Sequence, residues 1–348
     1  MAGKPASFFK CVGLKQEEVM ATFHYGGALR SLAHQLVSSS LDTLPPAGPQ
    51  AEGGSSSGVP PATLPPPGPP FPPPSLQAAA AGATFQASGS FRDAAGSSDP
   101  GVTAGLAEAS TLLRKAAGVY QWLAQSGCPR IMHEILPERP AELLSGMSLC
   151  LQSACQAEAQ AITAHRAGQR CTSPATTAAL HEGAAELFDE AARALTANTG
   201  ESASAAGVAV HEDEAQLEWA AAGVFNTVSD RLRRYLALSA SLQHVCAYKS
   251  LSDDLRLKGQ AGQGEACCVE ASRICDSCVS VAGSDPLWRA LLAQHLGALD
   301  AFRLACERDR VNITYQTVSR TTPAMVGPKI LATPIPYIPT PTESAALG

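Results

Sequence analysis

Apolar residues recur every three or four positions through the middle of the chain, which is the spacing of an amphipathic helix. Two such patterns fill residues 143–195 and are joined by a short segment, residues 170–174. Pro174 follows Thr172 and Ser173, and this favours a helix start there, because proline at the first helical position gives up no hydrogen bond. The patterns therefore predict an alanine-rich antiparallel helical hairpin.

The same spacing predicts further helices on both sides of this hairpin. The pair Gly26-Gly27 inside the first of them indicates a close approach of two helices, since glycine costs helix stability. The glycine-rich residues 259–264 are expected to interrupt the helical pattern. Asp285 before Pro286 is a typical helix start. The additional helices are expected at about residues 8–44, 106–123, 212–251, 265–281 and 286–310.

The last part of the chain, residues 311–341, carries β-branched residues and prolines instead of the helical spacing. This composition predicts an extended strap that lies across the helices. Helix pairs of this size indicate an all-α, tetratricopeptide-like solenoid. We find no clean 34-residue period, so the repeat is irregular.

Residues 45–103 differ in composition from the rest. Half of the 26 prolines fall between Pro45 and Pro74, and Ala, Gly and Ser follow them. Such a segment buries too little apolar surface to offset its ordering entropy, so we expect a disordered insertion. It would separate a first helical part, residues 1–44, from a main helical part, residues 104–341, with a flexible tail at 342–348. The insertion is either a solvated spacer or a polyproline ligand for SH3 or WW domains, with Pro65, Pro67, Pro70 and Pro73 as candidate contacts.

Overall composition narrows the class of protein. The 348 residues are 45% hydrophobic but only 5% aromatic, and alanine favours helix over sheet. A formal charge of −6 argues against a nucleic-acid surface. No apolar run reaches the length of a membrane span, and the start of the chain has no secretion signal. Eleven cysteines, an odd number, suit a reducing compartment, so we expect a cytosolic protein.

One cluster of cysteines is the most specific candidate for a metal or redox site. Cys267 and Cys268 precede Cys275 and Cys278, and four thiolates would suit zinc. The cluster falls in a helical pattern without a nearby histidine, however, so we interpret the cysteines as small packing residues and keep zinc or redox chemistry as an alternative. The chain also lacks the two-histidine metalloprotease motif and a phosphate-binding loop. We therefore expect no enzyme activity, cofactor or metal.

Several stretches resemble one known family. The clearest is residues 157–167, Ala-Glu-Ala-Gln-Ala-Ile-Thr-Ala-His-Arg-Ala, which resembles the Ala-Gln-Ala-Gln helix of the BRO domain, the Alix-like and Brox-type adaptor domain of endosomal sorting. Four further stretches agree with this family in the same order: residues 23–29, 105–123, 175–188, and 312–315 with 330–334. The resemblance covers residues 8–44 and 104–341. The N-terminal part of the family's domain, with its small β-sheet, has no counterpart here.

The resemblance implies a boomerang-shaped solenoid that acts as a non-enzymatic adaptor. Its partner would be the C-terminal amphipathic helix of the filament-forming ESCRT-III subunit, and it would reach endosomal membranes only indirectly. Carried over by position, the partner groove would include Leu106, Thr163, Thr176 and Leu180. Thr163 and Thr176 stand where other members have larger apolar residues, which would weaken binding. The alternative for Leu180 is an ordinary core residue. The alternative function is a scaffold that recruits partners through the proline-rich insertion.

Overall fold

The structure is a computed structural model that describes residues 6–42, 100–131, 141–197 and 229–339. The predictions for the proline-rich insertion, for residues 212–228 of the expected long helix and for the tail lie outside these residues. Within the described part the chain forms helices and an extended C-terminal segment, without strands. The helices are α1 (Ala6–Asp42), α3 (Pro100–Trp122), α4 (Cys128–Ile131), α5 (Ser145–Gln169), α6 (Pro174–Ala197), α9 (Asp230–Leu257), α10 (Ala261–Ala282) and α11 (Pro286–Asp309).

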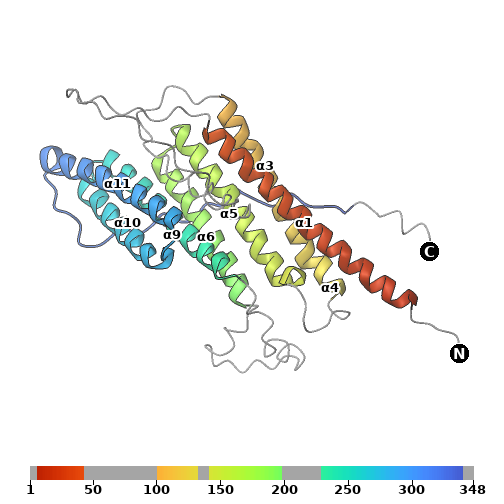
Figure 1. Ribbon diagram of the computed structural model, residues 1–348. Coiled ribbons are helices and arrows are strands. Elements are labelled where there is room, and N and C mark those ends of the chain that lie inside the picture. The colour runs from red at the N-terminus through yellow and green to blue at the C-terminus, as the bar shows by residue number, and fades with distance from the viewer. Residues whose placement is uncertain (1–5, 43–99, 132–140, 198–228, 340–348) are drawn as a thin grey trace, which may run out of the picture.

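The long helices lie side by side in one continuous row (Figure 1). Each packs chiefly on its neighbours in that row, in the order α1, α3, α5, α6, α9, α10 and α11. An array in which each element packs on the next is a solenoid. The all-α solenoid that the sequence predicts is therefore confirmed.

The central hairpin is also confirmed: α5 and α6 are joined by a short turn in which Cys171 has a positive φ of 54°. Some predicted boundaries differ from the structure. Helix α3 begins at Pro100, six residues before Leu106, and α9 continues to Leu257 instead of ending at residue 251. The prediction of one continuous helix over residues 212–251 is wrong at its start: Ser229 has a non-helical ψ of 128°, its side chain accepts from the Arg231 N–H, and α9 begins at Asp230.

The predicted break across residues 259–264 is wrong except at its first two positions. Gly259, with a φ of 74°, ends the turn after α9, and α10 already begins at Ala261. Gly262 and Gly264 therefore lie inside a helix. A Cβ atom on Gly264 would come within 3.0 Å of the Ser252 carbonyl oxygen on α9, so this glycine serves close helix packing.

The predicted start of the last helix is confirmed. The Asp285 side chain accepts hydrogen bonds from the backbone N–H groups of Leu287, at 3.0 Å, and Trp288, at 3.5 Å. Pro286 occupies the first turn. Because the cap satisfies N–H groups that have no partner within the helix, α11 begins sharply at this point.

Small residues let the helices of the core approach closely. Gly26 is a clear case, because a Cβ atom there would lie 3.0 Å from the ring of Tyr120 on α3. The close approach predicted for the glycine pair in α1 is confirmed at this residue. Larger side chains fill the remaining space, and the main core clusters contain Phe188, Tyr235, Leu236, Leu242, Trp288 and Leu292 between α6, α9 and α11, and Val19, Tyr120, Leu123, Ile131 and Leu151 between α1, α3, α4 and α5.

The strap predicted from residue 311 begins at residue 315, because Arg310–Thr314 form a π-helical turn that directly follows α11. Residues 315–339 are extended, as predicted. In Figure 1 this segment leaves α11 and passes behind the row of helices to emerge beside α1. Its backbone N–H groups donate to helix carbonyl groups at three places: Ser319 to Gly262 of α10, Lys329 to Ala179 of α6, and Ile335 to Arg114 of α3, at 3.2, 2.9 and 2.9 Å. The strap is therefore bonded to helices along most of the solenoid.

A glycine lies under the strap on each of these three helices. A Cβ atom would come within 1.8 Å of the Ile335 oxygen at Gly118, within 2.7 Å of the Lys329 oxygen at Gly183, and within 2.2 Å of the Thr317 oxygen at Gly262. The strap backbone thus occupies space that any other residue would fill.

Replacing Gly118 by alanine is expected to displace the strap from α3. The overlap with backbone atoms cannot be relieved by a side-chain rotation, so we expect a loss of about 1–3 kcal/mol in the free energy of unfolding. Gly297→Ala is the matched control, because nothing lies within 4 Å of a Cβ atom there. It should stabilise α11 by up to about 1 kcal/mol. Urea unfolding gives both values, and tryptic cleavage after Lys329 should accelerate in the first variant alone.

Candidate functional site

The side chain of Gln160, in the middle of α5, holds the strap at the centre of the solenoid. It is fully buried. Its Nε2 donates to the carbonyl oxygens of Leu180, at 3.1 Å, and Lys329, at 2.7 Å. Its Oε1 accepts from the backbone N–H groups of Leu331, at 2.9 Å, and Ala332, at 3.1 Å. Both donors and both acceptor positions of the amide are therefore in use.

Two neighbouring side chains extend this attachment. Gln156, one turn earlier on α5, donates to the Ala332 carbonyl at 3.2 Å. On α3, Arg114 donates from Nε to the Thr333 carbonyl at 2.7 Å and from Nη2 to the Thr333 hydroxyl at 3.3 Å. We call the surface of α3, α5 and α6 that carries strap residues 329–335 the strap face.

The four residues predicted to line a partner groove lie in these same three helices. Leu106, on α3, is 0% exposed and packs in the core cluster that includes Ala332 of the strap. Leu180, on α6, is 2% exposed, and its carbonyl is held by Gln160. Both leucines are therefore core residues in this structure. The sequence left this open, because helical spacing alone does not distinguish a buried helix face from an open groove.

The two threonines of the predicted set are partly exposed. Thr163 lies one turn after Gln160 on α5, and its hydroxyl donates to the Ala159 carbonyl at 2.9 Å. The Thr176 hydroxyl lies 2.8 Å from that of Ser173 in the first turn of α6. Since each hydroxyl is used locally, the methyl groups are the parts left to contact a partner. A binding role for these four residues stays a prediction.

Sequence reasoning missed the apolar residues that the strap brings to this face. Ile330 is 42% and Leu331 is 50% exposed, although the Leu331 N–H donates to Gln160 of α5 and the preceding Lys329 N–H donates to Ala179 of α6. The strap sequence showed only that this segment is extended. Its attachment to α5 depends on Gln160, which belongs to the motif that carries the family resemblance.

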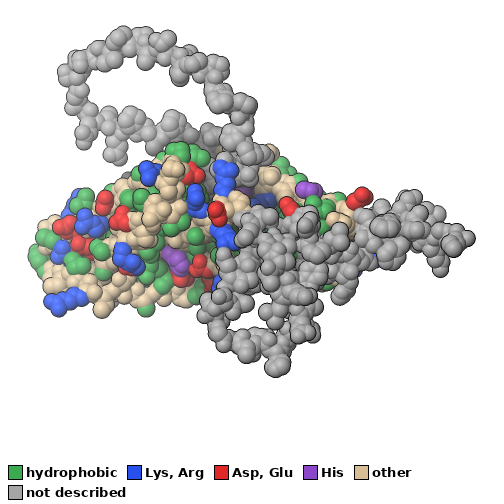
Figure 2. All heavy atoms as spheres, turned by 60° about the horizontal axis from the view of Figure 1, so that its bottom comes forward, with side chains coloured by type: hydrophobic (Ala, Val, Ile, Leu, Met, Phe, Trp, Pro, Cys, Tyr) green, Lys and Arg blue, Asp and Glu red, His purple; other side chains and the backbone are tan. Residues whose placement is uncertain are grey.

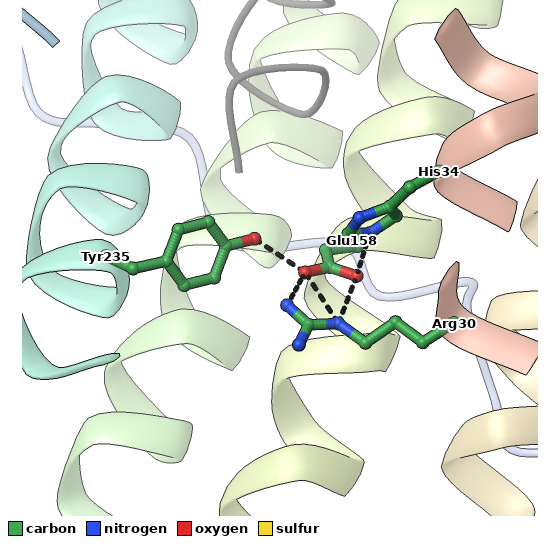
Figure 3. Close-up of polar contacts among 4 residues, drawn as sticks. All are labelled: Arg30, His34, Glu158 and Tyr235. Carbon is green, nitrogen blue, oxygen red and sulfur yellow. Dashed lines mark hydrogen bonds and ion pairs between the residues drawn. The ribbon is translucent and has the colours of Figure 1, made fainter. Parts of the chain in front are cut away.

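Glu158 connects different helices on the opposite side of α5. Positions two apart on a helix are rotated by about 200°, so Glu158 and Gln160 face opposite ways. Figure 3 shows the Glu158 carboxylate between Arg30 and His34 of α1 and Tyr235 of α9. Arg30 approaches to 2.5 Å, His34 Nε2 lies 2.9 Å away, and the Tyr235 hydroxyl donates at 2.5 Å.

This arrangement keeps the carboxylate charged. Burial alone would raise the pKa of the Glu158 carboxyl, but the charges and hydrogen bonds of Arg30 and His34 outweigh it, and the pKa lies well below its usual range. Burial, followed by the charge of Glu158, raises the pKa of the Tyr235 hydroxyl. Tyr235 therefore remains protonated and acts as a donor.

Removing the charge of Glu158 is expected to destabilise the fold. Glu158→Gln leaves Arg30 without its counter-charge, and the free energy of unfolding should fall by about 3 kcal/mol. Tyr235→Phe removes one hydrogen bond to a charged group and should cost about 1.5 kcal/mol. Asp300→Asn changes an acidic group that is 65% exposed, and should stay within about 0.5 kcal/mol of the wild type. Urea unfolding of the three variants would contradict this ranking if the first two were equal to the third.

Three histidines, of which His165 and His295 are buried and His181 is partly buried, are held neutral. Burial is the main cause in each case, and it lowers the pKa of His165 to about 3 and those of His181 and His295 to about 4. His181 Nδ1 lies 2.8 Å from Gln243 Oε1. His244 behaves in the opposite way, because its interactions with the accepting carboxylates of Asp189 and Glu182 raise its pKa to about 9.

Stability should therefore fall on mild acidification. The unfolded chain binds protons on His165, His181 and His295 below about pH 6.5, whereas the folded chain resists until pH 3–4. The contribution of these three neutral histidines to the free energy of unfolding is complete above about pH 6.5 and is lost progressively as the pH falls towards 4. His244, whose raised pKa makes the folded chain bind the extra proton between about pH 6.5 and 9, opposes this trend only above about pH 6.5. Urea unfolding at pH 6.5, 5.5 and 5.0 should therefore show a steady decrease, and His295→Gln should make it shallower. An equal slope in this variant would contradict the assignment.

The cysteine cluster predicted from the sequence lies in α10. Cys267, Cys268, Cys275 and Cys278 are all buried, as packing residues would be. Within the described ranges, no group of three or more His, Cys, Asp or Glu side chains is placed to hold a metal ion. The candidate polyproline contacts, Pro65, Pro67, Pro70 and Pro73, lie outside those ranges.

The surface shown in Figure 2 carries a mixture of charges. Acidic and basic side chains alternate with apolar ones over the end of the molecule formed by α9, α10 and α11. No single sign of charge dominates this face. None of the helices in the described segments is long and apolar enough to cross a membrane.

Comparisons with known proteins identify the fold. No protein-family model matches the sequence, and no curated protein does so. Among solved structures, the chain is similar to the ALIX BRO1 domain in a complex with CHMP4C, with a TM-score of 0.51 and 15% identity over 76% of this chain and 62% of that chain. It is also similar to ALIX in complex with a SIVmac239 late-domain peptide, with a TM-score of 0.50 and 15% identity over 76% of this chain and 32% of that one.

These likenesses show that the chain has a BRO1-like helical fold, as the sequence motifs indicated. The chain spans about three-fifths of the length of the ALIX BRO1 chain that it matches.

Proposed function

We propose that this protein is a non-enzymatic adaptor that binds the C-terminal amphipathic helix of an ESCRT-III filament subunit on its strap face. The fold supports this proposal, since the ALIX BRO1 domain with the same fold forms a complex with CHMP4C, an ESCRT-III subunit. Recruitment to endosomal membranes would then occur through the partner.

The observation that carries the proposal is a pair of exposed apolar side chains on an otherwise fixed surface. Ile330 and Leu331 are anchored through their backbones and neighbours to Gln160, yet are 42% and 50% exposed. Thr163 and Thr176 lie about one helical turn from the points where the strap crosses α5 and α6. An amphipathic helix needs such apolar positions for its anchors.

This geometry changes which residues supply the binding energy. Leu106 and Leu180 support the surface from below, because both are buried. The apolar contact that a larger residue would give at Thr163 or Thr176 is instead offered by Ile330 and Leu331. Burying a side chain of that size contributes roughly 1.5–3 kcal/mol.

A binding titration tests this proposal. A fluorescently labelled C-terminal helix from the ESCRT-III filament subunit is titrated with the wild-type chain, and its anisotropy is measured. Leu331→Asp should weaken binding at least tenfold, which is about 1.4 kcal/mol. Leu304→Asp is the matched control: Leu304 is 53% exposed on α11, and its replacement should leave affinity within about twofold.

Two further variants sharpen the test. Thr176→Ile adds apolar surface at the proposed contact and should tighten binding. Leu180→Asp places a charge in the core, so it should unfold the chain and is unsuitable as a binding variant. A folded wild-type chain that shows no saturable binding, or equal effects of Leu331→Asp and Leu304→Asp, would contradict the proposal.

A further inference from the structure

Two buried thiols from different helices meet at one serine. The Ser252 hydroxyl of α9 lies 3.2 Å from Cys268 Sγ of α10 and 3.5 Å from Cys306 Sγ of α11. The two thiols therefore share one hydroxyl partner. Both cysteines are 0% exposed and both are free. The pair differs from the Cys-x-x-Cys arrangement that the sequence suggested, because Cys306 lies far along the chain.

We propose that Cys268 and Cys306 are a reversible thiol-oxidation site, at which a peroxide oxidises Cys306 and Cys268 then closes a disulfide between α10 and α11. Both sulfur atoms lie within 3.5 Å of the Ser252 hydroxyl oxygen, so rotation of the two cysteine side chains can bring them towards the length of an S–S bond. The helices that carry them are already packed on each other.

The surroundings assign different roles to the two thiols. The neighbouring Cys268 thiol is the main cause that lowers the pKa of Cys306 below its usual range, with help from Ser252 and Arg256, although burial opposes it. The interaction with Cys306, together with burial, raises the pKa of Cys268. Burial raises the pKa of the neighbouring Cys267 and of Cys275 to about 12. Cys306 is therefore the thiol poised to react as thiolate.

The position of Cys306 gives a small oxidant access. It lies in the last full turn of α11, next to the π-helical turn Arg310–Thr314, which has no buried residue. Helix ends of this kind open locally at low cost. Two ion pairs, Arg256–Asp309 and Arg310–Glu265, hold this end of α11 against α9 and α10 at 2.5 and 2.6 Å. They keep the thiols together between openings.

The reaction balances with one peroxide. The Cys306 thiolate attacks one oxygen of hydrogen peroxide, the O–O bond breaks, and a sulfenic acid forms with release of hydroxide. The Cys268 sulfur then attacks the Cys306 sulfur, the S–O bond breaks, and the hydroxyl leaves as water with the Cys268 proton. Overall, two thiols are oxidised and one peroxide is reduced to two waters. A dithiol reverses the reaction by exchange.

The disulfide would join the last two helices just where the strap begins. Ser319 of the strap is bonded to Gly262, six residues before Cys268, and the strap starts shortly after Cys306. The bond would close a loop of about 39 residues, which restricts the unfolded chain. Oxidation should therefore stabilise this end of the solenoid.

The test exposes the folded full-length chain to submillimolar hydrogen peroxide, blocks the remaining thiols after denaturation and maps tryptic peptides by mass spectrometry. The expected product links residues 259–273, which contain Cys267 and Cys268, to residues 304–308. The unfolding midpoint should rise by about 5 °C and return after treatment with a dithiol.

Matched serine variants separate the neighbouring cysteines. Cys268→Ser should abolish the link and leave Cys306 as a sulfenic acid that dimedone traps, whereas Cys267→Ser should keep the link. Circular dichroism shows whether each variant is folded. Retention of both thiols in folded, peroxide-treated wild type, a link through Cys267, or a pairing of Cys275 with Cys278 would overturn the proposal.

Discussion

The buried amide of Gln160 is the interaction on which the architecture most depends. It makes four hydrogen bonds, and three of them go to strap residues Lys329, Leu331 and Ala332. An extended segment has no hydrogen bonds of its own, so each backbone group that it buries must find a partner among the helices. Gln160 supplies donors and acceptors together at the point where the strap crosses the centre of the row, and one side chain thus sets the strap's register.

The two faces of helix α5 make different contacts. Gln160 turns towards the strap and Glu158 turns towards α1 and α9, so residues of a single motif fix both sides of the solenoid. Glu158 also differs from the glutamine that the family motif carries at this place. A carboxylate at this position suits Arg30, because a guanidinium and a carboxylate form a stronger pair than two neutral groups. The surface that we propose for partner binding rests on the face that carries neutral amides.

The sequence located most of the described helices and the strap, because both follow from local spacing, but it placed the start of α9 too early by missing the cap at Ser229. The three-and-four pattern located the α5–α6 hairpin, and Asp285 with Pro286 located the start of α11. The same rules failed at Gly262 and Gly264, which look like breakers but lie where another backbone approaches. They also could not separate Leu106 and Leu180 from an exposed groove, since burial depends on what the strap covers. Ser252, Cys268 and Cys306 meet only through the packing of three helices.

The strap also affects the cooperativity and the order with which the solenoid folds. A row of helices in which each touches its neighbours unravels from its ends, and its parts fold independently. The strap joins Arg114 to Thr333 across 219 residues, and Gln156 to Ala332 across 176. Such distant contacts couple the two ends into one cooperative unit and slow its formation. On the ribosome, the helices would emerge and pack first, and the glycine-lined track across α10, α6 and α3 would stay open until the last residues of the domain were made.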